Sequence, residues 1–171
     1  MSSKVVNSKT VATALAVALA CASPGWAETA AALGAGTTQE QAFLARNAKA
    51  EGVVALPGLQ YKVVRSGPAT GLHPRRADDI TVRYVGQFID GKTFGASSDN
   101  GAGSETFPVQ KLIPGWIAAL QLMRPGDVWL LYIPAYLAYG ATGKSYIPPD
   151  STLIFQVELV SVTPEPEAPA R

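Results

Sequence analysis

The sequence predicts an α+β domain in which a small antiparallel β-sheet packs against one short α-helix. Three observations predict this fold class. Several segments alternate apolar and polar residues with a period of two, which is typical of half-buried strands. Within the same region only one run clearly carries apolar residues at helical spacing. The chain of 171 residues is 16% charged and holds 16 Gly and 13 Pro, a composition that favours a loop-rich β protein over a helical bundle.

Residues 1–27 are predicted to be a secretory signal peptide. Lys4 and Lys9 form a basic region in front of an apolar run at residues 10–22. That run is too short to span a bilayer, so an uncleaved anchor is the weaker alternative and stable membrane insertion is not expected. Small residues at Gly25 and Ala27 fit a cleavage site after Ala27, and we therefore expect an exported, periplasmic protein.

Cys21 is the only cysteine of the chain. A lipoprotein signal ending at Cys21 fits less well than cleavage after Ala27, because Ala18 stands where such signals usually have Leu. Cleavage after Ala27 would leave no cysteine in the mature protein. Disulfides, thiol catalysis and Cys-type zinc sites would then be excluded, and stability would have to come from burial.

Charge and histidine content exclude further function classes. The net charge is +1, which gives no electrostatic footprint for nucleic acid. His73, the only histidine, precedes Pro74 in a polar loop, where a surface role is expected rather than a general base or metal ligand. The sequence contains no Ser-His-Asp triad, metal motif or phosphate-binding glycine loop, so we expect no cofactor and no metal.

Residues 28–58 are predicted to form an extension with one helix. Thr38 and Gln41 have capping-box spacing, which predicts a helix that runs to about Glu51 and ends at Gly52. Its apolar face is narrow, and the pattern leaves open whether the helix docks or forms an arm. The extension is too short for a large dimerisation domain, which favours a monomer.

Residues 59–163 are predicted to form the main domain, followed by a proline-rich, disordered tail at 164–171. An Asp90-Gly91 hairpin joins two of its strands. The segment at residues 128–133 is apolar throughout, which predicts a central strand covered on both faces. Strands are predicted at residues 59–64, 80–88, 92–94, 106–109, 128–133 and 153–160.

The single helix of this domain is predicted to run from Trp116 to Met123. Pro114 fits its first turn, and Arg124-Pro125-Gly126 ends it. Its apolar stripe is by itself typical of core packing.

Five segments in register identify a family. Residues 82–94, 109–116, 138–143, 147–149 and 153–159 together resemble the FKBP-type peptidyl-prolyl cis-trans isomerases, over about residues 78–162. The resemblance implies a five-stranded antiparallel sheet wrapped around the short helix, preceded here by the helical extension. It also implies an isomerase that accelerates rotation about X–Pro bonds in exported proteins, and inhibition by macrolide-type ligands.

The resemblance further implies an aromatic pocket. Trp116 would lie under the proline ring, while the Tyr139 hydroxyl and the Ile113 backbone N–H would donate hydrogen bonds to substrate carbonyls. The catalytic residues implied are Tyr139, Ile113, Trp116, Tyr84 and Phe94, and the further substrate-binding residues are Leu112, Tyr146, Ile147 and Phe155.

Two positions depart from the family pattern. Gly95 stands where the family usually has an Asp that supports the pocket, and Ser104-Glu105 stand where a Phe often lies. A module that binds proline-containing segments without useful turnover is therefore an alternative function. A hydrolase has no supporting residues.

Overall fold

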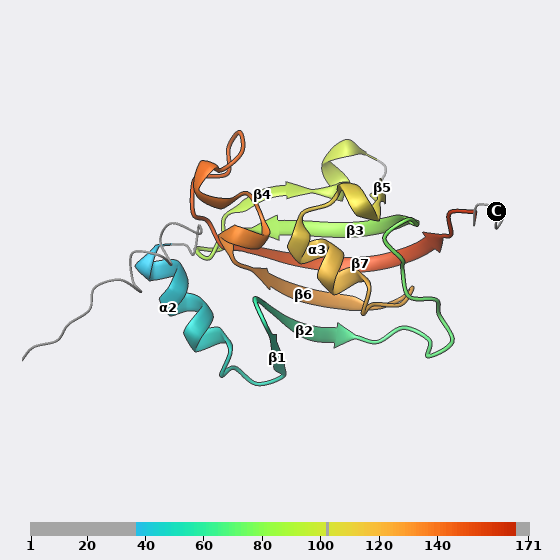
Figure 1. The fold of residues 1–171 in the computed structure, drawn as a ribbon, viewed down its shortest axis with the longest axis horizontal. Coiled ribbons are helices and arrows are strands. Elements are labelled where there is room, and N and C mark those ends of the chain that lie inside the picture. The colour runs from blue at the N-terminus through green and yellow to red at the C-terminus, as the bar shows by residue number, and fades with distance from the viewer. Residues whose placement is uncertain (1–36, 102, 167–171) are drawn as a thin grey trace, which may run out of the picture.

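The computed structural model describes residues 37–101 and 103–166 (Figure 1). The predicted signal peptide with Cys21, the first part of the predicted extension and the end of the predicted tail lie outside these residues. No helix within the two described ranges is both long enough and apolar enough to cross a membrane.

One seven-stranded antiparallel sheet forms the frame of the domain. Its strand order is β1-β2-β6-β7-β3-β4, and β5 also pairs with β3. Every strand pair is antiparallel. The strands are β1 (Val53–Leu56), β2 (Leu59–Arg65), β3 (Asp79–Gln87), β4 (Thr93–Ala96), β5 (Glu105–Pro108), β6 (Val128–Ile133) and β7 (Leu153–Thr163).

Two α-helices and four short 3-10 turns complete the described structure. Helix α3 (Pro114–Leu120) lies across the sheet, in front of β6 and β7 in Figure 1. Helix α2 (Thr38–Asn47) lies near one end of the sheet. The 3-10 turns are η1 (Ser97–Asn100), η2 (Val109–Lys111), η3 (Ala135–Leu137) and η4 (Gly140–Thr142).

The predicted α+β fold class is confirmed, with more strands than the five implied by the resemblance. The additional strand β1 pairs with β2 through Val53↔Lys62 and Leu56↔Leu59. Its four residues are too few to show a period, so the sequence pattern did not reveal it. The return half of the hairpin is split into β4 and β5, because η1 interrupts the pairing with β3.

The hydrophobic core lies between α3 and the sheet. Trp116, Ile117 and Leu120 on α3 face buried side chains of the central strands. Four residues of β6 are buried and two are half-buried. The buried ones are Val128, Trp129, Leu131 and Ile133, and the half-buried ones are Leu130 and Tyr132. The prediction that this strand is covered on both faces is therefore only partly right.

Helix α3 is shorter than predicted. It begins after Ile113, with Pro114 at its first position, and ends at Leu120. Met123 lies in the following turn, and its N–H donates to the Leu120 carbonyl. The helix approaches the sheet closely at Gly115, where a Cβ atom would overlap the side chain of Ile133. This contact explains why a glycine occupies a helix, where it is intrinsically unfavourable.

Helix α2 is capped by Thr37, one residue before the predicted cap. The Thr37 hydroxyl accepts from Glu40 N at 3.3 Å. The helix ends at Asn47 rather than near Glu51. Gly52 is not its terminus but adopts a positive φ of 75° just before β1. The chain therefore turns four residues earlier than the sequence predicted.

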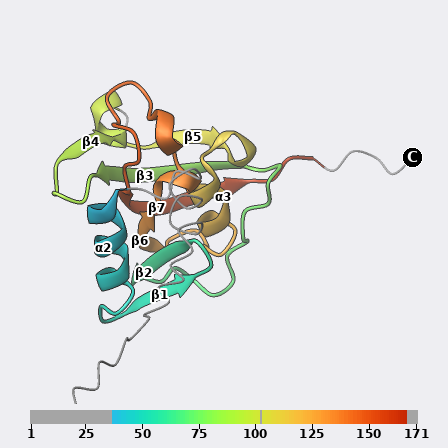
Figure 2. The same ribbon diagram turned by 60° about the vertical axis from the view of Figure 1, so that its left-hand side comes forward.

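The helix docks on the sheet face opposite α3, which decides between the two alternatives left open by its sequence. The rings of Phe43 and Tyr132 lie 6.2 Å apart. Gln60 Nε2 donates to the Leu44 carbonyl at 2.9 Å, and the Glu40 carboxylate accepts from Thr152 N at 3.0 Å. Figure 2 shows α2 beside β6 and β2.

Asp78, at the start of β3, is a buried charged residue. Its side chain is fixed by Arg75, whose Nη2 and backbone N donate to the carboxylate at 2.9 and 2.7 Å, and by Glu165 N at 3.1 Å. The residue is only 2% exposed. Hydrogen bonds from the Arg75 side chain lower the pKa of the Asp78 carboxyl, against the opposing effect of burial.

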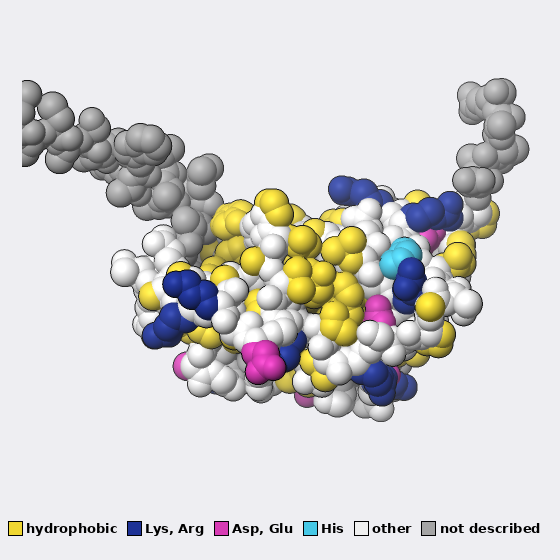
Figure 3. Space-filling view, turned by 90° about the horizontal axis from the view of Figure 1, so that it is seen from below, with side chains coloured by type: hydrophobic (Ala, Val, Ile, Leu, Met, Phe, Trp, Pro, Cys, Tyr) yellow, Lys and Arg dark blue, Asp and Glu magenta, His cyan; other side chains and the backbone are white. Residues whose placement is uncertain are grey.

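The edge of the sheet carries an apolar strip. In the view from below, hydrophobic side chains cross the middle of the surface, with Lys and Arg side chains toward its two ends (Figure 3). Val54 on the edge strand β1 is 42% exposed. Because β1 has only four residues, this edge offers little backbone for pairing with another strand.

Candidate active site

A cavity of about 570 Å³ opens to solvent between α3, the sheet and the loop that precedes β7. Its wall contains all nine residues that the family resemblance identified, so the fold brings together segments spread over 72 positions of sequence (84 to 155, both counted). The nine are Tyr84, Phe94, Leu112, Ile113, Trp116, Tyr139, Tyr146, Ile147 and Phe155.

Three strands and the helix supply the rings of the cavity. Tyr84, Phe94 and Phe155 come from β3, β4 and β7, where alternation turns them toward α3. Trp116 comes from the first turn of α3 and is 4% exposed. Four aromatic side chains therefore meet although no two of them are neighbours in sequence.

Phe155 is the centre of this ring cluster. Its ring lies 5.2 Å from that of Trp116 at 87°, and 5.4 Å from that of Phe94 at 88°. The Tyr84 ring meets Trp116 edge-on at 5.5 Å and 84°. Edge-to-face pairs of this kind are favourable beyond their area of burial, so the cluster holds a fixed shape.

Ile113 lies at the entrance to α3. Its backbone is extended, with φ −62° and ψ 148°, and its carbonyl accepts from Trp116 N and Ile117 N. These bonds fix the turn that carries Leu112 and Ile113 along the cavity wall. The role implied for the Ile113 N–H stays a prediction.

The loop after η3 forms the remaining wall. Lys144 and Ile147 exchange backbone hydrogen bonds of 3.0 and 2.8 Å, which closes a tight turn. The turn leaves Tyr146 69% exposed at the rim and buries Ile147 to 7% exposure. Lys144 Nζ lies 5.2 Å from the centre of the Tyr139 ring, within range of a cation–π contact.

The cavity has further lining residues that sequence reasoning did not identify as site residues. Glu105 and Phe107 share one side of β5, and the period of two on that strand could have shown it. Lys111 and Lys144 lie at other points of the wall, in segments without a regular period. Most residues of the lining are therefore apolar or aromatic, and two lysines and one carboxylate stand among them.

Tyr84 carries the perturbed hydroxyl of the site. Its Oη donates to Glu105 Oε1 at 3.5 Å. Burial first, and then the negative charge of Glu105, raise the pKa of Tyr84 to about 12. The Tyr84 hydroxyl is therefore a proton donor, not a base, throughout the physiological range.

His73 lies away from this cavity and is exposed, as predicted, with Nδ1 3.0 Å from the Met123 carbonyl oxygen. Among the described residues, no three His, Cys, Asp or Glu side chains are grouped so that they could hold a metal ion.

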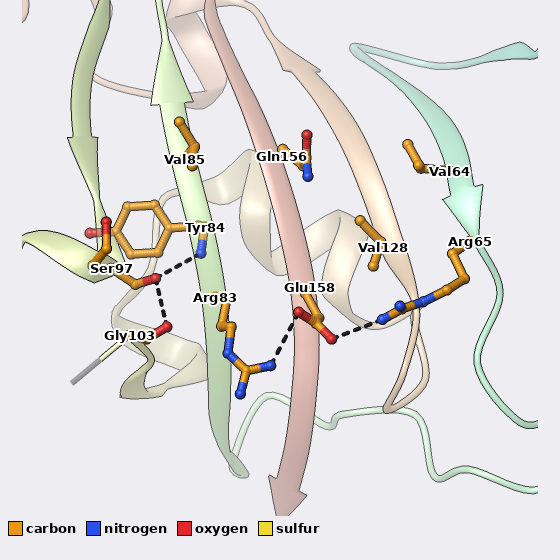
Figure 4. Close-up of a pocket in the computed structure, with 11 residues that line it drawn as sticks. Val64, Arg65, Arg83, Tyr84, Val85, Ser97, Gly103, Val128, Gln156 and Glu158 are labelled. Atoms are coloured by element: carbon orange, nitrogen blue, oxygen red, sulfur yellow. Dashed lines mark hydrogen bonds and ion pairs between the residues drawn. The ribbon is translucent and has the colours of Figure 1, made fainter. Parts of the chain in front are cut away.

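A second depression of about 500 Å³ lies on the opposite face of the sheet. Figure 4 shows its charged side chains paired with one another: Glu158 accepts from Arg65 at 2.8 Å and from Arg83 at 3.2 Å. The arginines are more than half exposed. This depression lacks the ring cluster, and we place the candidate active site at the Trp116 cavity.

Gly86 is required by the close approach of the rings. A Cβ atom at this position would lie 2.6 Å from two ring atoms of Phe94 and 3.0 Å from the ring of Phe155. We expect Gly86→Ala to lower the free energy of unfolding by about 1–3 kcal/mol through overpacking. Urea unfolding measures this loss.

The control for Gly86→Ala is Gly95→Ala on the paired strand. There an added Cβ would meet only the Tyr146 hydroxyl, at 3.9 Å. We expect this variant to unfold like the unaltered protein. Equal losses in the two variants would contradict the steric explanation.

Comparison with known proteins agrees with this geometry. Residues 71–160 match the family described as FKBP-type peptidyl-prolyl cis-trans isomerase. The chain is 48% identical over 122 residues to the FKBP-type 22 kDa peptidyl-prolyl cis-trans isomerase of Escherichia coli, covering 70% of this chain and 58% of that protein. It is 46% identical over 123 residues to outer membrane protein MIP of Legionella longbeachae. This match covers 71% of this chain and 52% of that protein. The chain thus spans just over half the length of these relatives.

Solved structures show the same fold. The crystal structure of FkpA from Escherichia coli superposes with a TM-score of 0.72 at 37% identity, covering 82% of this chain and 66% of that one. The crystal structure of a peptidyl-prolyl cis-trans isomerase from Pseudomonas syringae gives a TM-score of 0.68 at 36% identity. This match covers 74% of this chain and 92% of the other chain. With the match over more than half of its residues, the chain belongs to the FKBP-type peptidyl-prolyl cis-trans isomerase family.

Proposed function

We propose that this protein is a peptidyl-prolyl cis-trans isomerase that accelerates rotation about X–Pro bonds in other polypeptides. The observation that carries the proposal is the convergence of nine family-matching residues on one solvent-accessible, ring-lined cavity. The predicted signal peptide and the relative named an outer membrane protein support exported proteins as substrates and the periplasm as the location.

The chemistry fits a site without a nucleophile or metal. Rotation about an X–Pro amide crosses a barrier of about 18–20 kcal/mol that arises from amide resonance. No bond is made or broken, and the twisted transition state has a less polar carbonyl than the planar amide. A dry apolar cavity therefore stabilises the twisted form relative to the planar one, which lowers the barrier.

In this mechanism Trp116 supports the proline ring at the floor of the cavity. The Tyr139 hydroxyl and the Ile113 N–H donate to carbonyls of the substrate backbone and hold it beside the rotating bond. Tyr84, Phe94 and Phe155 exclude water from the side. Tyr146 and Ile147 close the loop side, where the exposure of Tyr146 leaves an entry for an extended chain.

The test is an isomerisation assay on a short peptide that contains one X–Pro bond, followed by NMR exchange with catalytic amounts of purified protein. Uncatalysed exchange takes roughly tens to hundreds of seconds, and faster exchange in the presence of the protein supports the proposal. Binding of the peptide without acceleration would instead favour a proline-segment-binding module, the alternative that Gly95 keeps open.

Tyr139→Phe tests one of the proposed hydrogen bonds. Loss of a neutral hydrogen bond costs about 0.5–1.5 kcal/mol, so we expect kcat/KM to fall by about 2- to 13-fold. The control is Tyr136→Phe on η3, an exposed tyrosine that does not line the cavity. An unchanged rate in Tyr139→Phe would remove this hydroxyl from the mechanism.

A further inference from the structure

Strand β5 brings a carboxylate to the cavity along the same edge of β3 that pairs with Gly95. Glu105 pairs with Val82 on β3, whereas Gly95 on β4 pairs with Gly86 farther along the same strand. Both residues line the cavity. The family usually has an Asp at the position of Gly95, so this chain lacks one carboxylate there and has another at Glu105. Because residues 82, 84 and 86 share one face of β3, these two positions flank Tyr84 along the strand.

Glu105 contacts the Tyr84 hydroxyl in the cavity wall. Tyr84 Oη donates to Glu105 Oε1 at 3.5 Å, in a partly buried position. The backbone of Tyr84 is fixed separately, since its N–H donates to Ser97 Oγ at 3.1 Å, as Figure 4 shows. The hydroxyl contact therefore holds the free end of a ring whose other end is already anchored.

We propose that Glu105 is a positioning residue that replaces the carboxylate absent at Gly95, by holding Tyr84 edge-on to Trp116. This inference rests on the proposed isomerase function. Tyr84 then keeps its hydroxyl directed at Glu105 and its ring edge 5.5 Å from the Trp116 ring, which preserves the side wall against which the proline amide rotates.

The electrostatics around Tyr84 agree with this role. After burial, the charge of Glu105 is the largest cause of its raised pKa, followed by the hydrogen bond to Glu105 and then by Tyr146 and Asp99. A protonated hydroxyl beside a carboxylate is a donor in a charge-assisted hydrogen bond. Such a bond tightens when solvent is displaced, which a bound substrate would do.

The space at Gly95 allows the two carboxylates to be exchanged by mutation. A Cβ atom there would meet only Tyr146 Oη, at 3.9 Å, and Gly95 does not have a positive φ. Gly95→Asp should therefore fold. Four proteins then form a double-mutant cycle: the unaltered protein, Glu105→Ala, Gly95→Asp and the double variant.

We expect Glu105→Ala to lower kcat/KM roughly 3- to 10-fold, with a smaller loss in Glu105→Gln, whose amide oxygen still accepts. Gly95→Asp should raise kcat/KM more in the Glu105→Ala protein than in the unaltered protein. Gln110→Ala, an exposed change on η2, is the control for disturbance near β5. Full activity of Glu105→Ala, or equal effects of Gly95→Asp in both backgrounds, would overturn the inference.

A spectroscopic titration tests the contact without any activity. NMR of ring-labelled tyrosine, with the Tyr84 signal assigned from Tyr84→Phe, should show the Tyr84 pKa falling in Glu105→Gln from about 12 toward ordinary values. An unchanged pKa would show that Glu105 does not hold Tyr84. If the unaltered protein fails to accelerate isomerisation, the proposed function falls, and the titration still decides whether the Glu105–Tyr84 contact exists.

Discussion

Phe155→Ala is expected to lower the free energy of unfolding by about 3–5 kcal/mol and to abolish the proposed isomerase activity. Phe155 is 5% exposed and meets the rings of Tyr84, Phe94 and Trp116. Removing its ring leaves a hole that the paired strands β3 and β6 on either side of β7 cannot close. Urea unfolding and the peptide isomerisation assay measure the two losses.

Tyr146→Ala is the matched variant on the rim of the same cavity. Because Tyr146 is 69% exposed, its removal should change the free energy of unfolding by no more than about 0.5 kcal/mol. Activity should still fall, since Tyr146 is proposed to contact substrate. If both variants lost stability equally, the ring cluster would not be organised around Phe155 as described.

Asp78→Ala is expected to lower the free energy of unfolding by about 1–3 kcal/mol, because it removes a buried acceptor while the Arg75 side chain stays about half exposed. The carboxylate is 2% exposed and accepts from Arg75 and from Glu165 N. Its removal takes this acceptor away at a point where the start of β3 meets the end of β7. Equilibrium unfolding in urea at pH 7 measures the loss.

The Asp78 carboxylate also predicts a pH dependence. Its pKa in the folded protein is lower than in the unfolded chain, so its stabilisation is fully present above the unfolded value near 4. That stabilisation is lost as the pH falls through the folded pKa. The difference in stability between the unaltered protein and Asp78→Asn should therefore shrink between pH 5 and the acid range.

Glu51→Gln is the control for Asp78→Asn, because Glu51 is an exposed carboxylate in the turn before β1. We expect its stability to follow that of the unaltered protein at each pH. A constant difference between the unaltered protein and Asp78→Asn at every pH would show that the loss comes from packing and not from ionisation.

The sheet could be predicted because its signals repeat along the sequence, whereas the ring cavity was implied by the family resemblance. The alternation on residues 80–88 and 153–160 predicts two half-buried strands, and spacing by three and four predicts the helix that carries Trp116. The register of five family-like segments then connected these elements into one site.

Other features depend on contacts between distant segments and left no local signal. Strand β1 is defined by its pairing with β2, and four residues cannot show a period. Helix α2 ends at Asn47, where turn hydrogen bonds from Lys49 N and Ala50 N replace the helical pattern that the sequence predicted to continue. Glu105 belonged to a segment noted only for lacking a Phe, and its contact with Tyr84 depends on the pairing of β5 with β3.

The position of the last strand has a consequence for how the chain acquires its structure during synthesis. β7 lies between β6 and β3 in the middle of the sheet, although it is made last. A nascent chain that ends before Leu153 would have two separate sheet halves with unpaired inner edges. We therefore expect the domain to fold only after Thr163 has left the ribosome, and to fold slowly because most of its pairing is non-local.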